Sequence, residues 1–336
     1  MLRVCGFIAI AIVAISVSVG IATTLGPANI SLVNVRDILA NHLLGYEIPV
    51  KLSKDAIVWE ERVPRSLIAA CCGAGLSLCG VIMQSLLRNP LADPYILGVS
   101  SGASTGAVMV GVLGIGSAAL GLSAGAFIGA VAAFVIVLML ARLSGGTTDK
   151  VLLAGIAATQ LFSALTSLIV FAVADSDEAR GVMFWLLGSL EGLRWDDVLL
   201  CVIVVVLGIA ISWNKAHILD AFTFGDNIAA TLGINVAVVR FAFLTLTALI
   251  TATLVAVTGA IGFLGLVLPH AARMIVGSNH AKVIPTAAIL GAVFMVWVDA
   301  FSRVAFAPSP LPAGVGTALV GVPVFIFLLA KKRRNT

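Results

Sequence analysis

The sequence predicts an all-α, polytopic membrane protein with about ten transmembrane helices. Of its 336 residues, 60% are hydrophobic and only 11% are charged. Apolar runs of about 20 residues, the length of a helix that crosses the hydrocarbon core, recur from one end of the chain to the other. A water-soluble domain of this length would need far more charge to cover its surface. The composition therefore excludes an ordinary soluble protein.

Charges, prolines and glycine clusters divide the chain into candidate spans. The ten spans cover roughly residues 4–25, 63–86, 94–113, 116–141, 151–173, 198–213, 237–257, 260–276, 284–302 and 315–330. The first span is too long for the core of a signal peptide, so we expect it to be retained. An even number of spans puts both termini on the same side of the membrane.

The lysines and arginines give the orientation. With the termini inside, the inner segments carry a net charge of +8 and the outer segments −3, while Asp299 lies within a span. Cytoplasmic segments are usually enriched in lysine and arginine, so the termini are expected to be cytoplasmic. This asymmetry accounts for the overall charge of +4 without a nucleic-acid partner.

Three connecting segments are too long to be simple turns. Residues 26–61 and 174–197 lie outside, and the second contains RGVMFWLLGSLEGL, which is compatible with a short helix at the membrane surface. The inner segment NKAHILDAFTFGDNIAATLGINVAVVR has apolar residues spaced for two short amphipathic helices around Gly225. Such a pair is either a solvated connector or a docking surface for a soluble partner.

Small residues are concentrated in the segment RNPLADPYILGVSSGASTGA, which opens the third span. Gly98, Gly102 and Gly106 recur every fourth residue, so on one helix they form a smooth face that a neighbouring helix can approach closely. Ser101 and Thr105 add hydroxyl groups on adjoining faces. These residues either pack helices together or line a polar pathway.

No catalytic or metal-binding residues are predicted. The sequence GVSSG matches the nucleophile motif G-x-S-x-G, but it lies within a predicted membrane helix rather than between a strand and a helix. HExxH and the phosphate-binding G-x-x-x-x-G-K-[ST] motif are both absent from the sequence. The five cysteines all lie in apolar segments and are expected to be small packing residues. If nucleotide drives this protein, another chain binds it.

Six sequence segments resemble, in order, the signatures of FecCD-type permeases, the membrane subunits of ABC importers for ferric siderophores, haem and cobalamin. The segments are RVPRSLIAACCGAGLSLCGVIMQSLLRNPLADPYILGVSSGAS, VLLAGIA, FWLLGSLEGLRW, GDNIAATLG, GAIGFLGLVLPHAARMIVG and LPAGVGTALVGVPVFIFLL. The resemblance implies one permease domain over residues 1–336 in the cytoplasmic membrane of a prokaryote. It also implies a second permease copy or homologue, two cytoplasmic ATPase subunits that bind ATP and Mg²⁺, and an extracytoplasmic solute-binding protein. No cofactor is expected on this chain.

The resemblance assigns three outer arginines, Arg62, Arg65 and Arg303, to docking of the binding protein. Arginine forks bind carboxylates in a bidentate manner and attract an acidic partner. The alternative is that they are anchors at the membrane interface, with Arg303 paired to Asp299. Where relatives usually have a glutamate before Leu-Pro, this chain has Pro310, a departure at the outer mouth.

The resemblance also assigns residues at the inner side. The segment 217–235 corresponds to helices that couple to the ATPase subunit, and the matched residues are Gly225, Asp226, Ala229, Leu232 and Gly233. In SGGTTDKVLLAG, Thr148 and Asp149 take the positions of a cytoplasmic gate. The alternative for these two is an ordinary inner turn in which Asp149 caps the following helix.

The expected pathway is lined by small and hydroxyl-bearing residues, because the cargo of such permeases is a bulky, polar chelate. The candidates are Ser101 and Thr105 with Gln160 and Ser163 of the fifth span, and each is equally compatible with hydrogen bonding between helices. Import of a ferric siderophore is the favoured function, with haem and cobalamin as alternatives. A membrane-embedded enzyme and an ATP-independent carrier are the rival classes.

Overall fold

The computed structural model describes residues 2–116, 121–145, 147–173, 176–305 and 311–333. All the regular secondary structure in these ranges is helical, which confirms the all-α prediction. The elements are α1 (Leu2–Thr24), α2 (Leu32–Leu44), α3 (Leu52–Ala56), the π-helical η1 (Ile57–Arg62), α4 (Val63–Leu86), the 3₁₀ turn η2 (Pro94–Leu97), α5 (Val99–Gly111), α6 (Leu122–Leu143), α7 (Thr148–Val173), α8 (Ser176–Leu186), α9 (Trp195–Asn214), α10 (Ala216–Thr223), α11 (Asp226–Thr231), α12 (Val236–Thr258), α13 (Leu264–Val276), α14 (His280–Ala305) and α15 (Ala313–Arg333).

Six helical stretches in the described part of the chain are long and apolar enough to cross a membrane. They cover residues 52–86, 122–143, 149–173, 195–214, 236–258 and 280–305. Three shorter apolar helices cover residues 10–24, 264–276 and 313–326. Each of these nine stretches overlaps one of the predicted spans, and the remaining predicted span, 94–113, contains η2 and α5.

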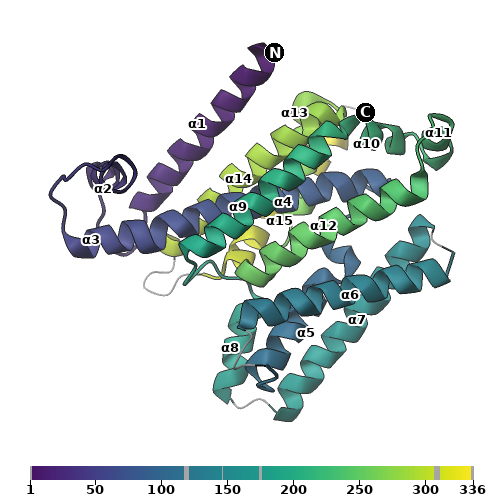
Figure 1. Cartoon of the computed structure of the whole chain (residues 1–336), viewed down its shortest axis with the longest axis horizontal. Helices are drawn as coiled ribbons and strands as arrows, with labels where there is room; N and C mark the ends of the chain where they lie inside the picture. The colour runs from purple at the N-terminus through teal and green to yellow at the C-terminus, as the bar shows by residue number, and fades with distance from the viewer. Residues whose placement is uncertain (1, 117–120, 146, 174–175, 306–310, 334–336) are drawn as a thin grey trace.

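Helix α4 is the centre of the fold. All but two of its 24 residues are buried, and α9, α12, α13 and α14 surround it (Figure 1). The neighbours approach closely because α4 carries glycines where it meets them. A Cβ at Gly73 would overlap the carbonyl of Gly291 in α14, and a Cβ at Gly80 would overlap the carbonyl of Gly265 in α13. The sequence of α4 thus sets how closely these helices pack.

A second glycine contact joins α5 to α6. A Cβ at Gly102 would overlap the Gly129 carbonyl, and one at Gly106 would overlap the Gly125 carbonyl. Gly98 does not share this face, in contrast to the expectation from its spacing. It lies between η2 and α5 in the left-handed region, with φ of 71°, and its nearest neighbour across the gap is Ala158 of α7. The cause is that η2 ends at Leu97 with Gly98 as its C-cap, so α5 begins only after Gly98.

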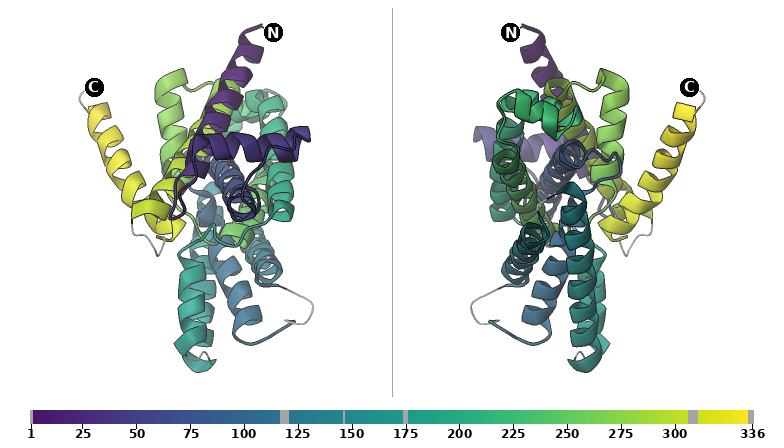
Figure 2. Two further views of the ribbon diagram at one scale, coloured as in Figure 1. Left: turned by 90° about the vertical axis from the view of Figure 1, so that its left-hand side faces the viewer. Right: turned by 90° about the vertical axis from the view of Figure 1, so that its right-hand side faces the viewer.

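The connecting helices gather at the two ends of the bundle. The first turn of α1, the last turn of α15 and the pair α10 and α11 lie toward one end, whereas α2, α3 and α8 lie toward the other (Figures 1 and 2). Helices α10 and α11 flank Gly225, whose φ of 110° is one that other residues rarely adopt. The prediction of two short helices around this glycine is confirmed, as is a short helix within residues 174–197.

The α5–α6 contact makes Gly102→Leu a severe substitution. A branched side chain at this position meets the α6 backbone, and overpacking of this kind costs about 1–3 kcal/mol of stability. Thermal unfolding of the purified protein in detergent measures the loss. Gly20→Leu is the matched control, because nothing lies within 4 Å of a Cβ at that helical glycine. Equal melting temperatures for the two variants would contradict the tight contact.

Candidate functional site

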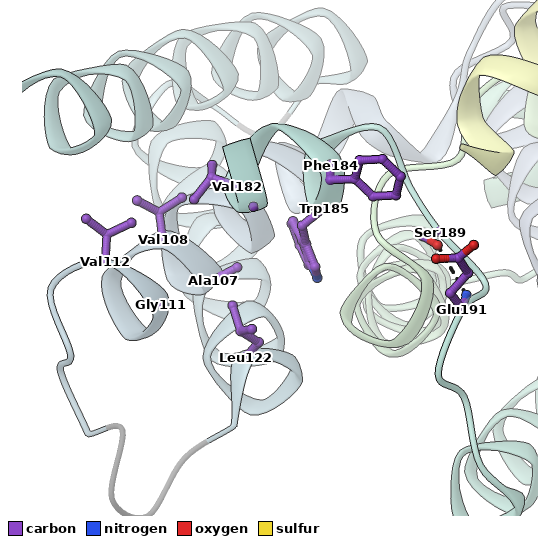
Figure 3. Close-up of a pocket in the computed structure, with 11 residues that line it drawn as sticks. Ala107, Val108, Gly111, Val112, Leu122, Val182, Phe184, Trp185, Ser189 and Glu191 are labelled. Atoms are coloured by element: carbon purple, nitrogen blue, oxygen red, sulfur yellow. Dashed lines mark hydrogen bonds between the residues drawn. The ribbon is translucent and has the colours of Figure 1, made fainter. Parts of the chain in front are cut away.

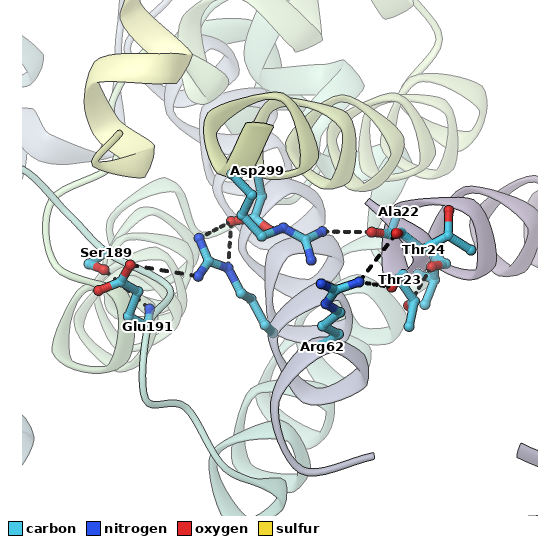
Figure 4. A network of polar contacts seen from close by, with 10 residues as sticks. Ala22, Thr23, Thr24, Arg62, Ser189, Glu191 and Asp299 are labelled. Atoms are coloured by element: carbon cyan, nitrogen blue, oxygen red, sulfur yellow. Dashed lines mark hydrogen bonds and ion pairs between the residues drawn. The ribbon is translucent and has the colours of Figure 1, made fainter. Parts of the chain in front are cut away.

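Three arginines and one aspartate form a buried cluster at the end of the bundle where α2 and α3 lie. We call Arg62, Arg65, Arg303 and Asp299 the outer arginine cluster (Figure 4). Arg65 Nε donates to Asp299 Oδ1 at 2.8 Å, and Arg303 Nε lies 3.2 Å from Asp299 Oδ2. Asp299 is only 1% exposed, so one buried carboxylate compensates two guanidinium groups. This ion pairing fixes α4 against α14.

The same cluster holds the end of α1. Arg62 donates hydrogen bonds to three carbonyl groups between residues 23 and 28, at distances of 3.0 to 3.2 Å. Arg303 Nη2 donates to the carbonyl of Ala22 at 2.9 Å. The last carbonyls of a helix have no partner within it, and here arginine side chains supply their donors. The cluster therefore connects α1, α4 and α14.

The burial of the arginines bears on the docking hypothesis. Arg62, Arg65 and Arg303 are 3%, 5% and 5% exposed, so in this conformation their guanidinium groups are directed at the chain itself. One exposed acidic residue contacts the cluster. The carboxylate of Glu191 lies 4.0 Å from Arg65 Nη1. The Arg303–Asp299 pair of the alternative interpretation is present. Pro310 lies outside the described residues.

Helices α10 and α11 form what we call the coupling pair, which is the segment assigned by resemblance to ATPase contact. Asp226 at the start of α11 accepts two hydrogen bonds from Arg240 Nη2, at 2.7 and 2.8 Å. The Arg240 guanidinium also lies 5.7 Å from the centroid of the Phe222 ring of α10, within cation–π range. Ala229 is fully buried. Of the matched residues, Asp226 and Ala229 thus hold the coupling pair onto α12 and the body of the protein.

Three large apolar side chains within the segment 217–235 are exposed. Phe224, Ile228 and Leu232 are 72%, 47% and 67% exposed. Gly225 and Gly233, with φ of 110° and 80°, allow the chain to turn at either end of α11. Grouped large apolar side chains outside a lipid-facing segment are typical of an interaction surface.

A third polar group was not anticipated from the sequence. Ser85 of α4, Asp220 of α10 and His280 of α14 form what we call the inner triad. His280 Nε2 lies 2.5 Å from Ser85 Oγ, and His280 Nδ1 lies 2.6 Å from Asp220 Oδ1. The three residues are far apart in the chain and match no local motif, so only the tertiary structure reveals them.

The inner triad has the residue types of a hydrolase triad but not the access. Ser85 is 2% exposed and His280 is 1% exposed, so in this structure a substrate carbonyl cannot approach the serine oxygen. Ser85 Oγ also donates to the carbonyl of Val81 at 2.9 Å. In the described part of the chain, no group of three His, Cys, Asp or Glu side chains is placed to hold a metal ion. The geometry points to a structural or mechanical role rather than to catalysis.

The four candidate pathway residues have different environments. Thr105 is buried and bonds to Thr166 Oγ1 and to the Phe162 carbonyl of α7, both at 2.8 Å. Ser101 Oγ donates to the carbonyl of Gly98, which directly precedes α5, at 3.0 Å. Gln160 and Ser163 are exposed on α7. Thr105 therefore joins α5 to α7, whereas the two α7 residues are free to face a partner or a pathway.

The proposed gate lies at the start of α7. Asp149 is exposed in the first turn of this helix. The side chain of Thr148 lies outside the part of the structure that is described. A gate and an ordinary turn are both compatible with this position.

A cavity of about 420 Å³ lies between α5, α6 and α8 (Figure 3). Its walls are mostly apolar, and they include Val108, Leu122 and Trp185. Ser189 and Glu191 are its polar residues.

Comparisons with known proteins give a consistent result. A sequence model of the FecCD transport family matches residues 9–331. The chain is 39% identical to the cobalamin import system permease protein BtuC of Halobacterium salinarum, over 85% of this chain and 78% of that protein. It is 36% identical to the hemin transport system permease protein HmuU of Yersinia pestis, over 82% of this chain and 83% of that protein.

A solved structure extends the match to the fold. It is described as an inward-facing conformation of a metal-chelate type ABC transporter. The TM-score is 0.83 at 28% identity, and the match covers 96% of this chain and 97% of that one.

The outer arginine cluster predicts a large cost for Asp299→Asn. This substitution leaves two buried guanidinium groups without their carboxylate, and removal of one partner from a buried pair costs about 3–5 kcal/mol. Thermal or denaturant unfolding in detergent measures the change. Asp37→Asn is the control, because Asp37 pairs with the largely exposed Arg36, and such surface pairs contribute about 0–1 kcal/mol. Similar stabilities for the two variants would show that the buried pair is not needed.

Proposed function

The chain belongs to the FecCD transport family, and we propose that it is the transmembrane permease subunit of an ATP-driven importer for a metal chelate or metal macrocycle. The family match extends over residues 9–331, nearly the whole chain. In this proposal the chain itself makes and breaks no bonds. A partner subunit binds ATP and Mg²⁺ and hydrolyses the nucleotide.

The proposed topology has ten spans in one domain, residues 1–336. Six long helices and three shorter apolar helices account for nine, and η2 with α5 forms the tenth. The first turn of α1 and the last turn of α15 lie toward the same end of the bundle as the coupling pair (Figure 1). Since lysine and arginine are concentrated in the segments assigned to that end, we place it in the cytoplasm of a prokaryotic cell.

The observation that carries the proposal is the exposure of three large apolar side chains within the segment 217–235. Phe224, Ile228 and Leu232 project from a part of the chain that is too polar and too short to enter the bilayer. A soluble partner that covers them would gain about 25 cal/mol for each Å² of apolar surface removed from water. An ATPase subunit is the partner that fits a permease of this family.

Transport then follows by alternating access. ATP closes the two ATPase subunits, the coupling segment 217–235 moves with them, and the helices that line the dimer axis reopen to the other side. A second permease copy or homologue completes the pathway. Among the six long helices α7 is the least buried, and it exposes Gln160 and Ser163, which supports a place for it beside that pathway.

Docking of a solute-binding protein at the outer end remains part of the proposal. Arg65 is the arginine of the cluster that reaches a half-exposed carboxylate, that of Glu191, through a long contact of 4.0 Å. A carboxylate of the binding protein would replace Glu191 at this position. Replacement of a weakly held acid requires little rearrangement of the remaining cluster.

Ferric siderophores are the first cargo candidates, and haem and cobalamin are the second. The relative in Halobacterium salinarum is named for cobalamin import and the one in Yersinia pestis for hemin transport. All three cargoes are bulky metal complexes, but ferric siderophores and cobalamin are polar, whereas the haem macrocycle is largely apolar and carries two propionate groups.

An uptake assay separates these cargoes and the rival classes. The permease is tagged, purified from its source cells with its partner subunits, and reconstituted into proteoliposomes with the binding protein. We expect ATP-dependent accumulation of one of three probes: a ferric hydroxamate, haemin or cyanocobalamin. Uptake that does not need ATP would indicate a carrier, and chemical conversion of the probe would indicate an enzyme.

If the exposed apolar residues of the coupling segment 217–235 contact the ATPase subunit, the double variant Phe224→Glu and Leu232→Glu should lose that subunit. Charges placed on a central apolar contact each cost more than about 1.4 kcal/mol, so co-purification should fall by about tenfold or more. Leu52→Glu is the matched control, because Leu52 is 88% exposed at the opposite end of the bundle. Undiminished ATPase co-purification by a folded double variant would refute this docking surface.

A further inference from the structure

The inner triad joins three helices through directional bonds. Asp220 Oδ1 accepts from the backbone N–H of His280 at 3.0 Å and is 2.6 Å from the imidazole Nδ1 of the same residue. The Asp220 carboxylate therefore caps the first turn of α14 and also holds the His280 side chain. His280 Nε2 in turn reaches Ser85 Oγ at 2.5 Å in α4. Helix α10 is thus bonded to α14 directly and to α4 through the imidazole.

Counting protons shows which of these bonds persist. The Ser85 hydroxyl has one hydrogen, and both the Val81 carbonyl and His280 Nε2 lie within reach of it. If it donates to Val81, His280 donates from both nitrogens and is an imidazolium paired with the Asp220 carboxylate. If it donates to Nε2, the neutral imidazole still donates Nδ1–H to Asp220. The bond between α10 and α14 is therefore present in both protonation states.

The second half of the coupling pair is bonded elsewhere. Helix α11 is held through Asp226 to Arg240 of α12. Between the two attachments lies Gly225, at φ of 110°, where the backbone can turn. The hydrogen bonds of the two helices thus differ: α10 bonds to α14 directly and to α4 through the imidazole, whereas α11 bonds to α12. The Phe222 ring of α10 also contacts Arg240 of α12 through the cation–π interaction.

Apolar packing alone would not fix α10 in place. Leu219 and Phe222 of α10 are fully buried, but apolar contacts are non-directional and permit sliding. Charge-assisted hydrogen bonds in a buried site are short, strong and directional. The inner triad supplies directional bonds where α10 meets the two helices; Ser85 and His280 are buried, whereas the Asp220 side chain is 32% exposed.

We propose that the inner triad is the joint that transmits displacement of α10 to α4 and α14 during transport. In this proposal Asp220 and His280 are positioning residues that act through the helices they connect. The inference rests on the proposed function, because it concerns the coupling of ATP hydrolysis to movement of this chain. It adds the residues through which that coupling passes.

The test compares His280→Gln and Ser85→Ala with Trp213→Phe. Trp213 Nε1 of α9 donates to the carbonyl of Ala281 at 2.9 Å, so its replacement also removes a hydrogen bond at the start of α14, but not one from α10. The readout is the number of ATP molecules hydrolysed per probe molecule taken up. The probe is the ferric hydroxamate, haemin or cyanocobalamin that the wild-type complex imports.

We expect the ratio to rise by about fivefold or more in the two triad variants, the factor that corresponds to one lost buried hydrogen bond. For Trp213→Phe, both the amount of co-purified ATPase and the number of ATP molecules hydrolysed per probe molecule should equal the wild-type values. A wild-type ratio in His280→Gln and Ser85→Ala, with ATP-driven uptake intact, would overturn the joint and leave the proposed function standing. Wild-type uptake without ATP would instead contradict the proposed function.

Hydrogen–deuterium exchange of the purified permease tests the bonds themselves without cargo or ATPase. Amides in residues 216–223 should exchange faster in His280→Gln than in Trp213→Phe. Equal protection would overturn the joint even if the variant proved too unstable for transport measurements. Ser85→Ala, a small change that removes only the hydroxyl, provides the same readout with less risk to folding.

Discussion

The close approach of backbones at the glycines of α4 is the constraint on which the structure depends. Gly73 meets Gly291 of α14, and Gly80 meets Gly265 of α13, with no room for a methyl group at either contact. Lipid tails are as apolar as the side chains, so helices in a bilayer associate through such close packing and through polar bonds rather than through the hydrophobic effect. The central helix is consequently buried on every side, and the polar clusters at its two ends are held in fixed register.

Each of these two clusters pairs buried polar groups and joins α14 to another helix, but with different residues. At the outer end, a single carboxylate, Asp299, compensates two arginines, and at the inner end the Asp220 carboxylate accepts hydrogen bonds from the backbone and the imidazole of His280. Both acids connect α14 to another helix. Polar groups are costly in a membrane unless they are paired, so each pair also determines which helix neighbours which.

The features that the sequence predicted are those with local signals. The span at 63–86 matches α4, and the turn at Gly225 separates two short helices as expected, because apolar periodicity and glycine are local properties. The role of Gly98 was missed because η2 interrupts the expected helix before it. The inward direction of the outer arginines and the inner triad depend on contacts between residues far apart in the chain. No spacing rule within one helix reports such contacts.

The separation of α4 from α14 along the chain has a consequence for biogenesis. Arg65 and Asp299 are 234 residues apart, so α4 leaves the ribosome long before the helix that neutralises it exists. Until then Arg65, the one arginine of α4, must remain at the level of the lipid headgroups, where long basic side chains can reach water. The glycine faces meanwhile contact lipid or the insertion machinery. The most deeply buried helix of the finished protein is thus inserted before most of its neighbours and becomes enclosed only when the C-terminal helices arrive.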